Sequence, residues 1–237
     1  MTKARHLGIV AVSAEGAALC YRTICVEGAA SFGTHGHPEI AMHTYPLADY
    51  MRHIERDCWD EVGKLLLSSA HKVVNAGAEL LLCPDNTVHQ ALDLVRAQSS
   101  VPWLHIAEEV GTVAATRGFR QLGILGTRYL MEGPVYPTTL AERGIASEIP
   151  DPADRERINA VIFDELVQGE FKDESRLYFQ GVIQRLATRG CDAVVLGCTE
   201  IPLLVSESDS ELPVIDSTRT LARAALREAL IASPVAR

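Results

Sequence analysis

The chain alternates between short, continuous apolar runs and longer segments with helical apolar spacing. The apolar runs cover residues 6–12, 39–45, 78–83, 102–106, 121–127, 192–198 and 212–216. Because most of them are continuous rather than alternating, they predict parallel strands covered on both faces. The helical segments cover residues 59–77, 89–98, 107–118, 156–169, 174–190 and 218–232. Strands that alternate with helices predict an α/β fold with parallel sheets flanked by helices.

Two stretches of the chain repeat the same order of features. AGAELLLCPDNTVH (76–89) and RGCDAVVLGCTEIP (189–202) each follow a long helical segment and read as a glycine turn, a strand and a polar turn with a threonine. This weak internal repeat predicts two pseudo-symmetric lobes. We expect one lobe over 1–116 plus 217–237, to which the last helix returns, and a second over 117–216. Open α/β sheets bind ligands at the carboxyl ends of their strands, so the active site is expected between the lobes.

Composition narrows the classes of function. The chain is 47% hydrophobic and 22% charged, which is ordinary for a soluble globular protein. Its net charge of -9 argues against a nucleic-acid partner, because phosphate binding needs a concentrated basic surface. The first apolar run is short and interrupted by SAEG, unlike a signal peptide, and no run reaches the ~20 residues that span a membrane. We expect a cytoplasmic protein with a small-molecule partner and no membrane partner.

No standard cofactor or metal motif is present. The six cysteines lack CxxC metal spacing and are expected to be mostly free and buried. The glycines form neither GxGxxG nor a P-loop. His35, His37 and His43 raise the possibility of a metal site, but no matched carboxylate accompanies them. Neither a metal nor a nucleotide cofactor is therefore expected.

The GCTEIP turn (197–202) offers a candidate catalytic thiol. Gly197 allows a close backbone approach, and Thr199 can cap the next segment or bind a ligand. A Cys198 thiol at a helix N-terminus would have a favoured thiolate, because backbone N–H groups stabilise negative charge there. The alternative is a structural buried cysteine followed by a capping threonine.

The CPDNTVH turn (83–89) is the counterpart in the first half of the chain. Asn86 and Thr87 suit a carboxylate or an amine, and Asp85 can act as a base. Pro-Asp-Asn-Thr is equally a turn and helix-capping sequence, which is the alternative interpretation.

Together the two turns resemble the paired signatures of the aspartate/glutamate racemase family. In that family a Cys-Asn-Thr turn of one lobe faces a Gly-Cys-Thr-Glu turn of the other. The matching positions here are Asn86-Thr87 with His89, and Gly197-Cys198-Thr199-Glu200. Residues 125–136, 213–220 and 103–107 resemble further family segments, so the resemblance covers nearly the whole chain.

The resemblance implies inversion at the α-carbon of an amino acid, without PLP or metal, in a site between two lobes. Cys198 and Asp85 would be the catalytic groups on opposite faces of the substrate. The α-carboxylate and amine require oriented hydrogen bonds and two aligned proton-transfer groups. The substrate-binding candidates are Ser13, Asn86, Thr87, Thr127, Thr199, Glu200 and Lys172. Family members are often homodimers, so a homodimer is expected.

The sequence departs from the family pattern at its first catalytic position. Asp85 stands where the family has a cysteine, and Cys83, two residues earlier, is expected to be a buried strand residue. Three outcomes are then open. In the first, racemisation uses Asp85 and Cys198 as an unequal pair of proton-transfer groups. In the second, one enantiomer is processed much faster than the other. In the third, the protein catalyses a different reaction that needs only one thiol. The loop at 11–16 also lacks the family's Gly-Gly-Met stretch and carries Glu15, which would repel an acidic side chain if it faced the pocket.

The predicted function is racemisation of a small acidic amino acid. A basic group should then meet the distal carboxylate, and Lys172, Arg52, Arg176 and His43 are candidates. One alternative is a single-cysteine lyase or isomerase acting on a small dicarboxylate, like the arylmalonate decarboxylases or maleate isomerases of the same superfamily. The other is a catalytically inactive small-molecule binding protein.

Overall fold

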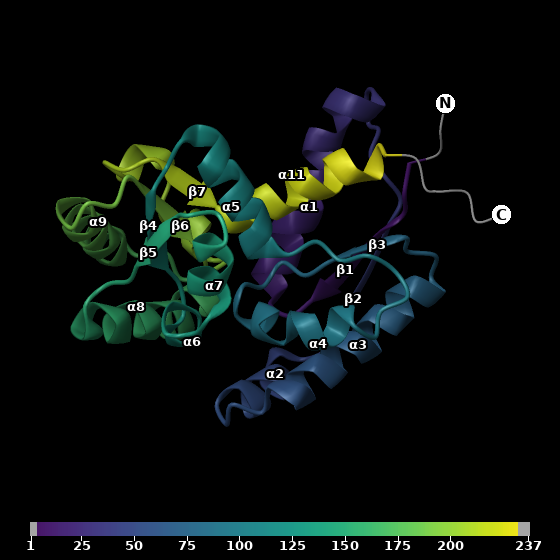
Figure 1. Ribbon diagram of the computed structural model, residues 1–237, viewed down its shortest axis with the longest axis horizontal. Helices are drawn as coiled ribbons and strands as arrows, with labels where there is room; N and C mark the ends of the chain where they lie inside the picture. The colour runs from purple at the N-terminus through teal and green to yellow at the C-terminus, as the bar shows by residue number, and fades with distance from the viewer. Residues whose placement is uncertain (1–3, 232–237) are drawn as a thin grey trace. The chain divides into compact units, whose positions relative to one another are not determined.

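The computed structural model describes residues 4–231, which divide into two compact units (Figure 1). Unit 1 runs from the N-terminus to Ile106 and resumes at Thr218, whereas unit 2 comprises Ala107–Ser217. The domain boundaries expected from the sequence stay a prediction. In the structure, Ala107, Val110 and Ala114 pack with the core of unit 2, which assigns their helix to that unit rather than to the first.

Unit 1 is built on a three-stranded parallel sheet with the strand order β2-β1-β3. Its elements are β1 (Leu7–Ala11), α1 (Ala14–Phe32), β2 (Ile40–Thr44), α2 (Leu47–Ile54), α3 (Trp59–Asn75), β3 (Leu80–Leu82), the 3-10 helix η1 (Thr87–Ala91), α4 (Leu92–Arg96) and most of α11 (Ser217–Ala229). The strand expected at 102–106 is reduced to one parallel bridge between Leu81 and Trp103.

Helices cover both faces of the first sheet. Leu7, Ile9 and Ala11 pack in one buried cluster with residues of α1 and α11, which lie side by side in Figure 1. Gly8 points to the opposite face, where a Cβ atom would lie 2.9 Å from Cγ2 of Val73 on α3. Helix α3 thus packs closely on β1 because position 8 has no side chain.

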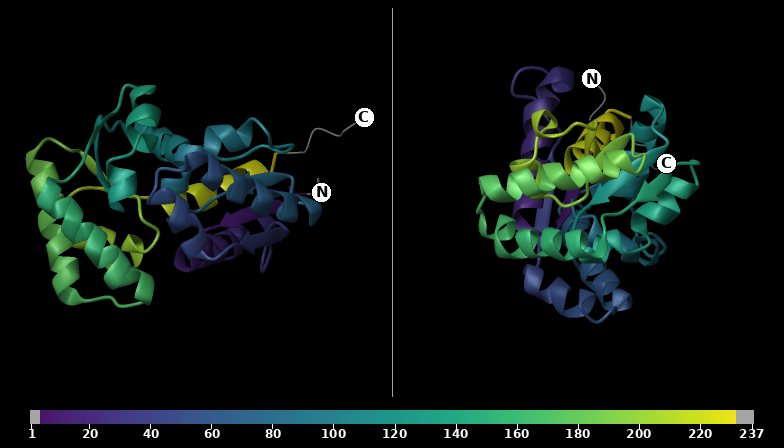
Figure 2. Two further views of the ribbon diagram at one scale, coloured as in Figure 1. Left: turned by 90° about the horizontal axis from the view of Figure 1, so that it is seen from below. Right: turned by 90° about the vertical axis from the view of Figure 1, so that its left-hand side faces the viewer.

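Unit 2 repeats this plan with a four-stranded parallel sheet of order β5-β4-β6-β7. Its elements are α5 (Ile106–Arg117), β4 (Gln121–Leu125), α6 (Arg128–Met131), α7 (Val135–Ala141), β5 (Ala146–Glu148), α8 (Pro152–Asp164), η2 (Leu166–Gln168), α9 (Asp173–Thr188), β6 (Ala193–Leu196), α10 (Ile201–Leu204), η3 (Glu207–Asp209) and β7 (Val214–Asp216). Helices α5 and α7 pack on one face, and α8 and α9 pack on the other (Figure 2). An α/β fold with parallel sheets flanked by helices is therefore confirmed.

The internal repeat seen in the sequence has a structural counterpart. Gly77 follows α3 and Gly190 follows α9, and both adopt positive φ angles, 103° and 92°. Each glycine ends its helix in a conformation that favours glycine and leads into a strand, β3 or β6. In its own sheet, each of these strands pairs with the first strand of its unit.

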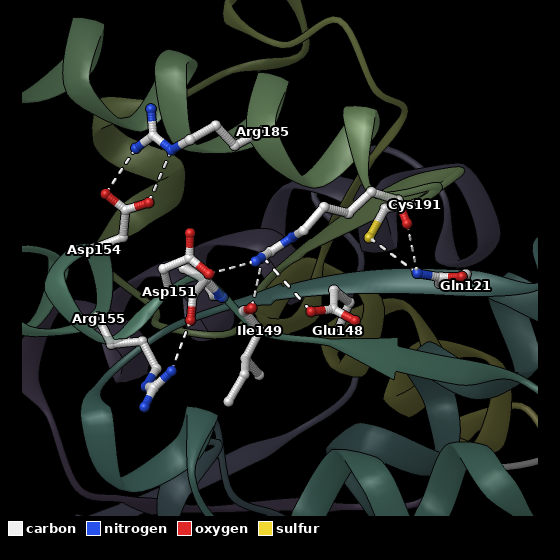
Figure 3. Close-up of polar contacts among 10 residues, drawn as sticks. Gln121, Glu148, Ile149, Asp151, Asp154, Arg155, Arg185 and Cys191 are labelled. Carbon is white, nitrogen blue, oxygen red and sulfur yellow. Dashed lines mark hydrogen bonds and ion pairs between the residues drawn. The ribbon is translucent and has the colours of Figure 1, made fainter.

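A network of polar side chains holds the amino edge of the second sheet (Figure 3). Gln121 at the start of β4 donates to the carbonyl oxygen of Arg189, and Arg185 of α9 makes two hydrogen bonds to Asp154 of α8. Tyr178 also donates to Asp154, at 2.5 Å. These contacts stabilise the edge opposite to the one where β4 and β6 end.

The sequence-based prediction lacks three α-helices of seven or more residues, namely α1, α2 and α7, as well as the four-residue helices α6 and α10. In α1 the buried residues include Gly16, Ala17, Cys20, Thr23 and Gly28. Such small residues give a weak apolar periodicity, which hides a helix of 19 residues.

Among residues 4–231, no helix is both long and apolar enough to cross a membrane.

Candidate active site

The strand order places one ligand-binding edge in each unit. In unit 1 the chain moves from β1 outward to β2 and returns to β3 on the other side of β1. In unit 2 it moves from β4 to β5 and returns to β6 on the other side of β4. Such switch points favour ligand binding beyond the carboxyl ends of the two central strands. In unit 1, Ser13 follows β1 and Asp85 follows β3. In unit 2, Thr127 follows β4 and Cys198 follows β6.

Ser13 and Thr127 occupy equivalent positions and have the same local role. The Ser13 hydroxyl oxygen accepts from the backbone N–H of Gly16 at 3.2 Å and caps α1. The Thr127 hydroxyl oxygen accepts from the N–H of Leu130 at 3.3 Å and caps α6. Both side chains are thereby fixed at the carboxyl edge of their sheets.

Asp85 is held in the turn that follows β3. Its Oδ1 atom accepts from the N–H of Val88 at 3.1 Å, and the side chain is half-buried. Asn86 and Thr87 are buried beside it. The fixed carboxylate can accept a proton from a ligand at this edge, and the neighbouring amide and hydroxyl can orient that ligand.

His89 stabilises the Asp85 turn through hydrogen bonds to the backbone. Its Nδ1 atom accepts from the N–H of Ile106 at 3.4 Å, so Nε2 carries the ring proton and donates to the carbonyl oxygen of Cys83 at 3.0 Å. The neutral ring thus ties the start of the Asp85 turn to the segment before α5. This contact gives the Asn-Thr-x-His pattern a structural reason.

Cys83 lies just beyond β3 and is fully buried. Burial raises the pKa of its thiol well above the ordinary value, and the charge of Asp85 raises it further. The thiol therefore stays protonated, and Asp85 is the group of this turn that is suited to take up a proton.

Cys198 and Thr199 converge on one buried carboxylate. The thiol of Cys198 donates to Oε2 of Glu200 at 3.0 Å, and the hydroxyl of Thr199 donates to the same oxygen at 2.8 Å. All three residues are buried. The following helix, α10, has only four residues, so its N-terminus offers the thiol little stabilisation, and Glu200 is a hydrogen-bond partner of the thiol.

Gly197 lets the Cys198 turn pass close to β4. Its N–H donates to the carbonyl oxygen of Leu125 at 2.6 Å. A Cβ atom at position 197 would lie 2.6 Å from Cδ2 of Leu130 and 2.9 Å from the same carbonyl oxygen. A side chain would collide with the backbone there, so the glycine is required for the position of Cys198.

The basic residues considered for a distal carboxylate all have protein partners. Lys172 lies 3.0 Å from Glu170 and 3.4 Å from Glu165, and the hydrogen bond to Glu170 is the largest effect that raises its pKa. Arg176 binds Asp173 and the carbonyl oxygen of Leu204, and Arg52 binds Asp49. In His43, burial and the charge of Lys72 lower the pKa, which favours the neutral ring. No basic residue is therefore singled out by geometry.

The other residues considered from the sequence are Glu15 and the histidines of a possible metal site. Glu15 is exposed in the first turn of α1. Nδ1 of His37 contacts the carbonyl oxygen of Pro38 at 2.8 Å. Within residues 4–231, no three His, Cys, Asp or Glu side chains form a group that could hold a metal ion.

Sequence reasoning missed Tyr50, a fully buried tyrosine of α2. Burial raises its pKa, and the negative charges of the ionised forms of Cys83 and Asp85 raise it further. The segment LADYMRHI gives no motif that would have identified it, because its relation to Asp85 arises only from folding.

Comparison with known proteins agrees with this geometry. Residues 9–225 match the sequence model of the Asp/Glu/hydantoin racemase family. The broad-specificity amino-acid racemase RacX of Bacillus subtilis is 23% identical over 188 residues, which are 79% of this chain and 80% of that protein. The glutamate racemases that it matches are longer, and the chain spans 54% to 62% of their length.

Solved structures show the same fold. A provisionally assigned Asp/Glu racemase from Yersinia pestis superposes with a TM-score of 0.87 at 33% identity, covering 95% of this chain and 99% of that one. An aspartate racemase homologue from Pyrococcus horikoshii gives a TM-score of 0.82 at 27% identity, covering 97% and 99%. Since the family match includes both polar turns and nearly the whole described chain, this protein belongs to the Asp/Glu/hydantoin racemase family.

Proposed function

We propose that this enzyme, an amino-acid racemase by its family, inverts a small acidic amino acid without PLP. Asp85 and Cys198 would exchange protons with opposite faces of the α-carbon. The observation that carries the proposal is the equivalent placement of these two groups, each after the strand that closes the switch point of its unit.

The two proton-transfer groups are chemically unequal. An aspartate has an unperturbed pKa of about 3.9 and a cysteine of about 8.5. The proposed starting pair is an Asp85 carboxylate and a Cys198 thiol, the form in which the thiol donates to Glu200. The carboxylate takes the α-proton from one face, the electron pair passes to the α-carboxylate of the substrate, and the thiol gives its proton to the other face.

The reverse direction requires the opposite protonation pattern. Because a thiolate is intrinsically a stronger base than a carboxylate, the pair of thiolate and carboxylic acid is the less stable of the two. Glu200 offers the thiol proton a nearby acceptor, because its Oε2 lies 3.0 Å from Sγ. The thiolate abstracts the α-proton of the other enantiomer, the electron pair passes to the α-carboxylate, and Asp85 returns to the opposite face the proton that it took up in a forward turnover or from solvent.

This inequality has a defined kinetic signature. Two enantiomers have the same free energy in water, so kcat/KM must be equal in the two directions. The individual kcat and KM values, and the rate of solvent exchange at each face, are free to differ. We expect the enantiomer whose α-proton faces Asp85 to exchange first.

A second function is favoured by one observation, the burial of Cys83. With that thiol inaccessible and protonated, the two turns present a single working cysteine. A lyase or isomerase acting on a small dicarboxylate needs only one. That function predicts turnover of a dicarboxylate without α-proton exchange of any amino acid.

Proton exchange in D2O separates these functions. The protein is incubated with L- and D-aspartate and L- and D-glutamate, and the α-proton signal is followed by NMR together with chiral chromatography. Exchange with inversion supports racemisation, whereas exchange with retention supports a single working base. Absence of exchange with all four amino acids would contradict the proposed function.

We further propose a cytoplasmic homodimer. The six cysteines, all within residues 4–231, form no disulfide, as is usual in a reducing compartment, and family resemblance favours a dimer. Light scattering coupled to size exclusion would measure the mass in solution, and a monomer would contradict the proposal.

A further inference from the structure

Tyr50 is a buried tyrosine whose hydroxyl lacks a protein partner. Its side chain is 0% exposed, and its oxygen forms no hydrogen bond with the part of the chain that the structure describes. A buried hydroxyl without a partner is costly, so such a group is uncommon in a folded protein. It calls for a partner from outside the described residues.

The position of Tyr50 in the fold relates it to Asp85. Helix α2 begins three residues after β2, so its first turn lies at the carboxyl edge of the first sheet. Ser13 and Asp85 leave the same edge after β1 and β3. Because the three strands are parallel and adjacent, these segments occupy one end of unit 1.

Electrostatics agrees with this placement. Burial is the main cause that raises the pKa of Tyr50, and the charge of Asp85 adds to it. The phenol therefore keeps its proton throughout the working pH range. It is therefore a hydrogen-bond donor that stays protonated, and it is close enough to Asp85 to respond to the charge of that carboxylate.

Other unpartnered buried atoms in the described chain have different surroundings. Arg5 and His6 precede β1 at the amino edge of the first sheet, and Arg189 lies at the amino edge of the second. Thr218 begins the part of α11 that belongs to unit 1. Tyr50 is the member of this set whose ionisation responds to the charge of Asp85.

We propose that Tyr50 is a substrate-binding residue, whose hydroxyl donates a hydrogen bond to the α-carboxylate of the amino acid. The inference rests on the proposed function, because it takes Asp85 as the base. Negative charge grows on that carboxylate when the α-proton leaves, and a fixed donor stabilises it. A cation in the same place would pair with Asp85 and make it a weaker base, whereas a neutral phenol does not.

The test compares two tyrosine-to-phenylalanine variants. Tyr50→Phe removes only the unpartnered hydroxyl, so the melting temperature of the ligand-free protein should stay the same or rise. The kcat/KM for α-proton exchange should fall by roughly 10- to 100-fold, as for loss of a hydrogen bond to a charged group. The control, Tyr178→Phe, loses the hydrogen bond to Asp154 in unit 2, so its melting temperature should fall while kcat/KM is unchanged.

Binding is measured separately, by the rise in melting temperature with L-aspartate, L-glutamate or malonate. The wild-type protein should be stabilised by at least one of these carboxylates, and Tyr50→Phe should be stabilised less. A Tyr50→Phe variant with wild-type kcat/KM and ligand stabilisation would overturn the inference and leave the proposed function intact. Wild-type protein that binds carboxylates but exchanges no α-proton would contradict the proposed function, and the binding of Tyr50→Phe would then decide on Tyr50. Wild-type protein that does neither would overturn both.

Discussion

The thiol of Cys198 donates a hydrogen bond to Oε2 of Glu200, 3.0 Å away, inside the buried turn that follows β6. Thr199 donates to the same oxygen at 2.8 Å. The thiol proton is thereby directed to a carboxylate before any substrate binds. In a reaction that needs thiol and thiolate in turn, this carboxylate is a proton acceptor within hydrogen-bond distance of the thiol.

Glu200→Gln should slow the direction of reaction that needs the thiolate. The amide oxygen can still accept from Cys198 but cannot take its proton. We expect roughly a 10-fold or greater loss in kcat for one enantiomer, within the range that a positioned base contributes. NMR rates for both enantiomers would measure it. Glu207→Gln, at an exposed position of η3, is the matched control, and equal rates in the two variants would exclude this role for Glu200.

Asp85→Asn should remove one base while preserving the turn. The asparagine side-chain oxygen can still accept from the N–H of Val88, as Asp85 does at 3.1 Å. We expect inversion to be lost, with the melting temperature nearly unchanged. Asp85→Cys should instead raise or balance racemisation, because two thiols have similar proton affinities. A substantial loss of activity in Asp85→Cys would show that the aspartate does more than replace a thiol.

Cys198→Ala should separate exchange from inversion. With Asp85 as the remaining base, one enantiomer should exchange its α-proton for deuterium with retention of configuration, and the other should not exchange. Chiral chromatography with mass spectrometry would detect this pattern. Cys58→Ala removes an exposed cysteine and serves as the control. Wild-type inversion by Cys198→Ala would remove the thiol from the mechanism.

The ion pair between Glu27 and Arg223 should make a pH-dependent contribution to the stability of unit 1. Arg223 holds the pKa of Glu27 below its ordinary value of 4.5 through two hydrogen bonds, of 2.7 and 2.8 Å. A lowered folded-state pKa stabilises the protein above the unfolded pKa, and the effect is lost as pH falls through the folded value. Both side chains are partly exposed, so screening limits the contribution to about 0.2–1 kcal/mol.

Arg223→Gln tests this contribution by denaturant unfolding at pH 7 and at pH 3. The variant should be less stable than wild type at pH 7, and the difference should shrink at pH 3, because protonation of Glu27 weakens the ion pair. A difference of the same size at both pH values would assign the loss to packing of the arginine stem instead.

Much of the fold was predictable because local patterns determine it. Continuous apolar runs anticipated β1, β4 and β6, and the glycine turns at Gly77 and Gly190 mark where α3 and α9 end. The pattern failed at α1, whose buried residues are small, and at residues 102–106, where one bridge at Trp103 replaces a strand. In both places packing of residues far apart in sequence decides the structure.

For the candidate site, the sequence by itself determined the chemical groups and their order: Asp85 before Asn86 and Thr87, and Cys198 before Thr199 and Glu200. It did so because a turn that follows a strand is a local feature. Only the tertiary structure decided what surrounds these groups, because burial and partner choice depend on distant segments. It gave His89 its backbone partners and left the hydroxyl of Tyr50 buried at the edge where Asp85 lies, whereas the burial of Cys83 was already expected from the sequence.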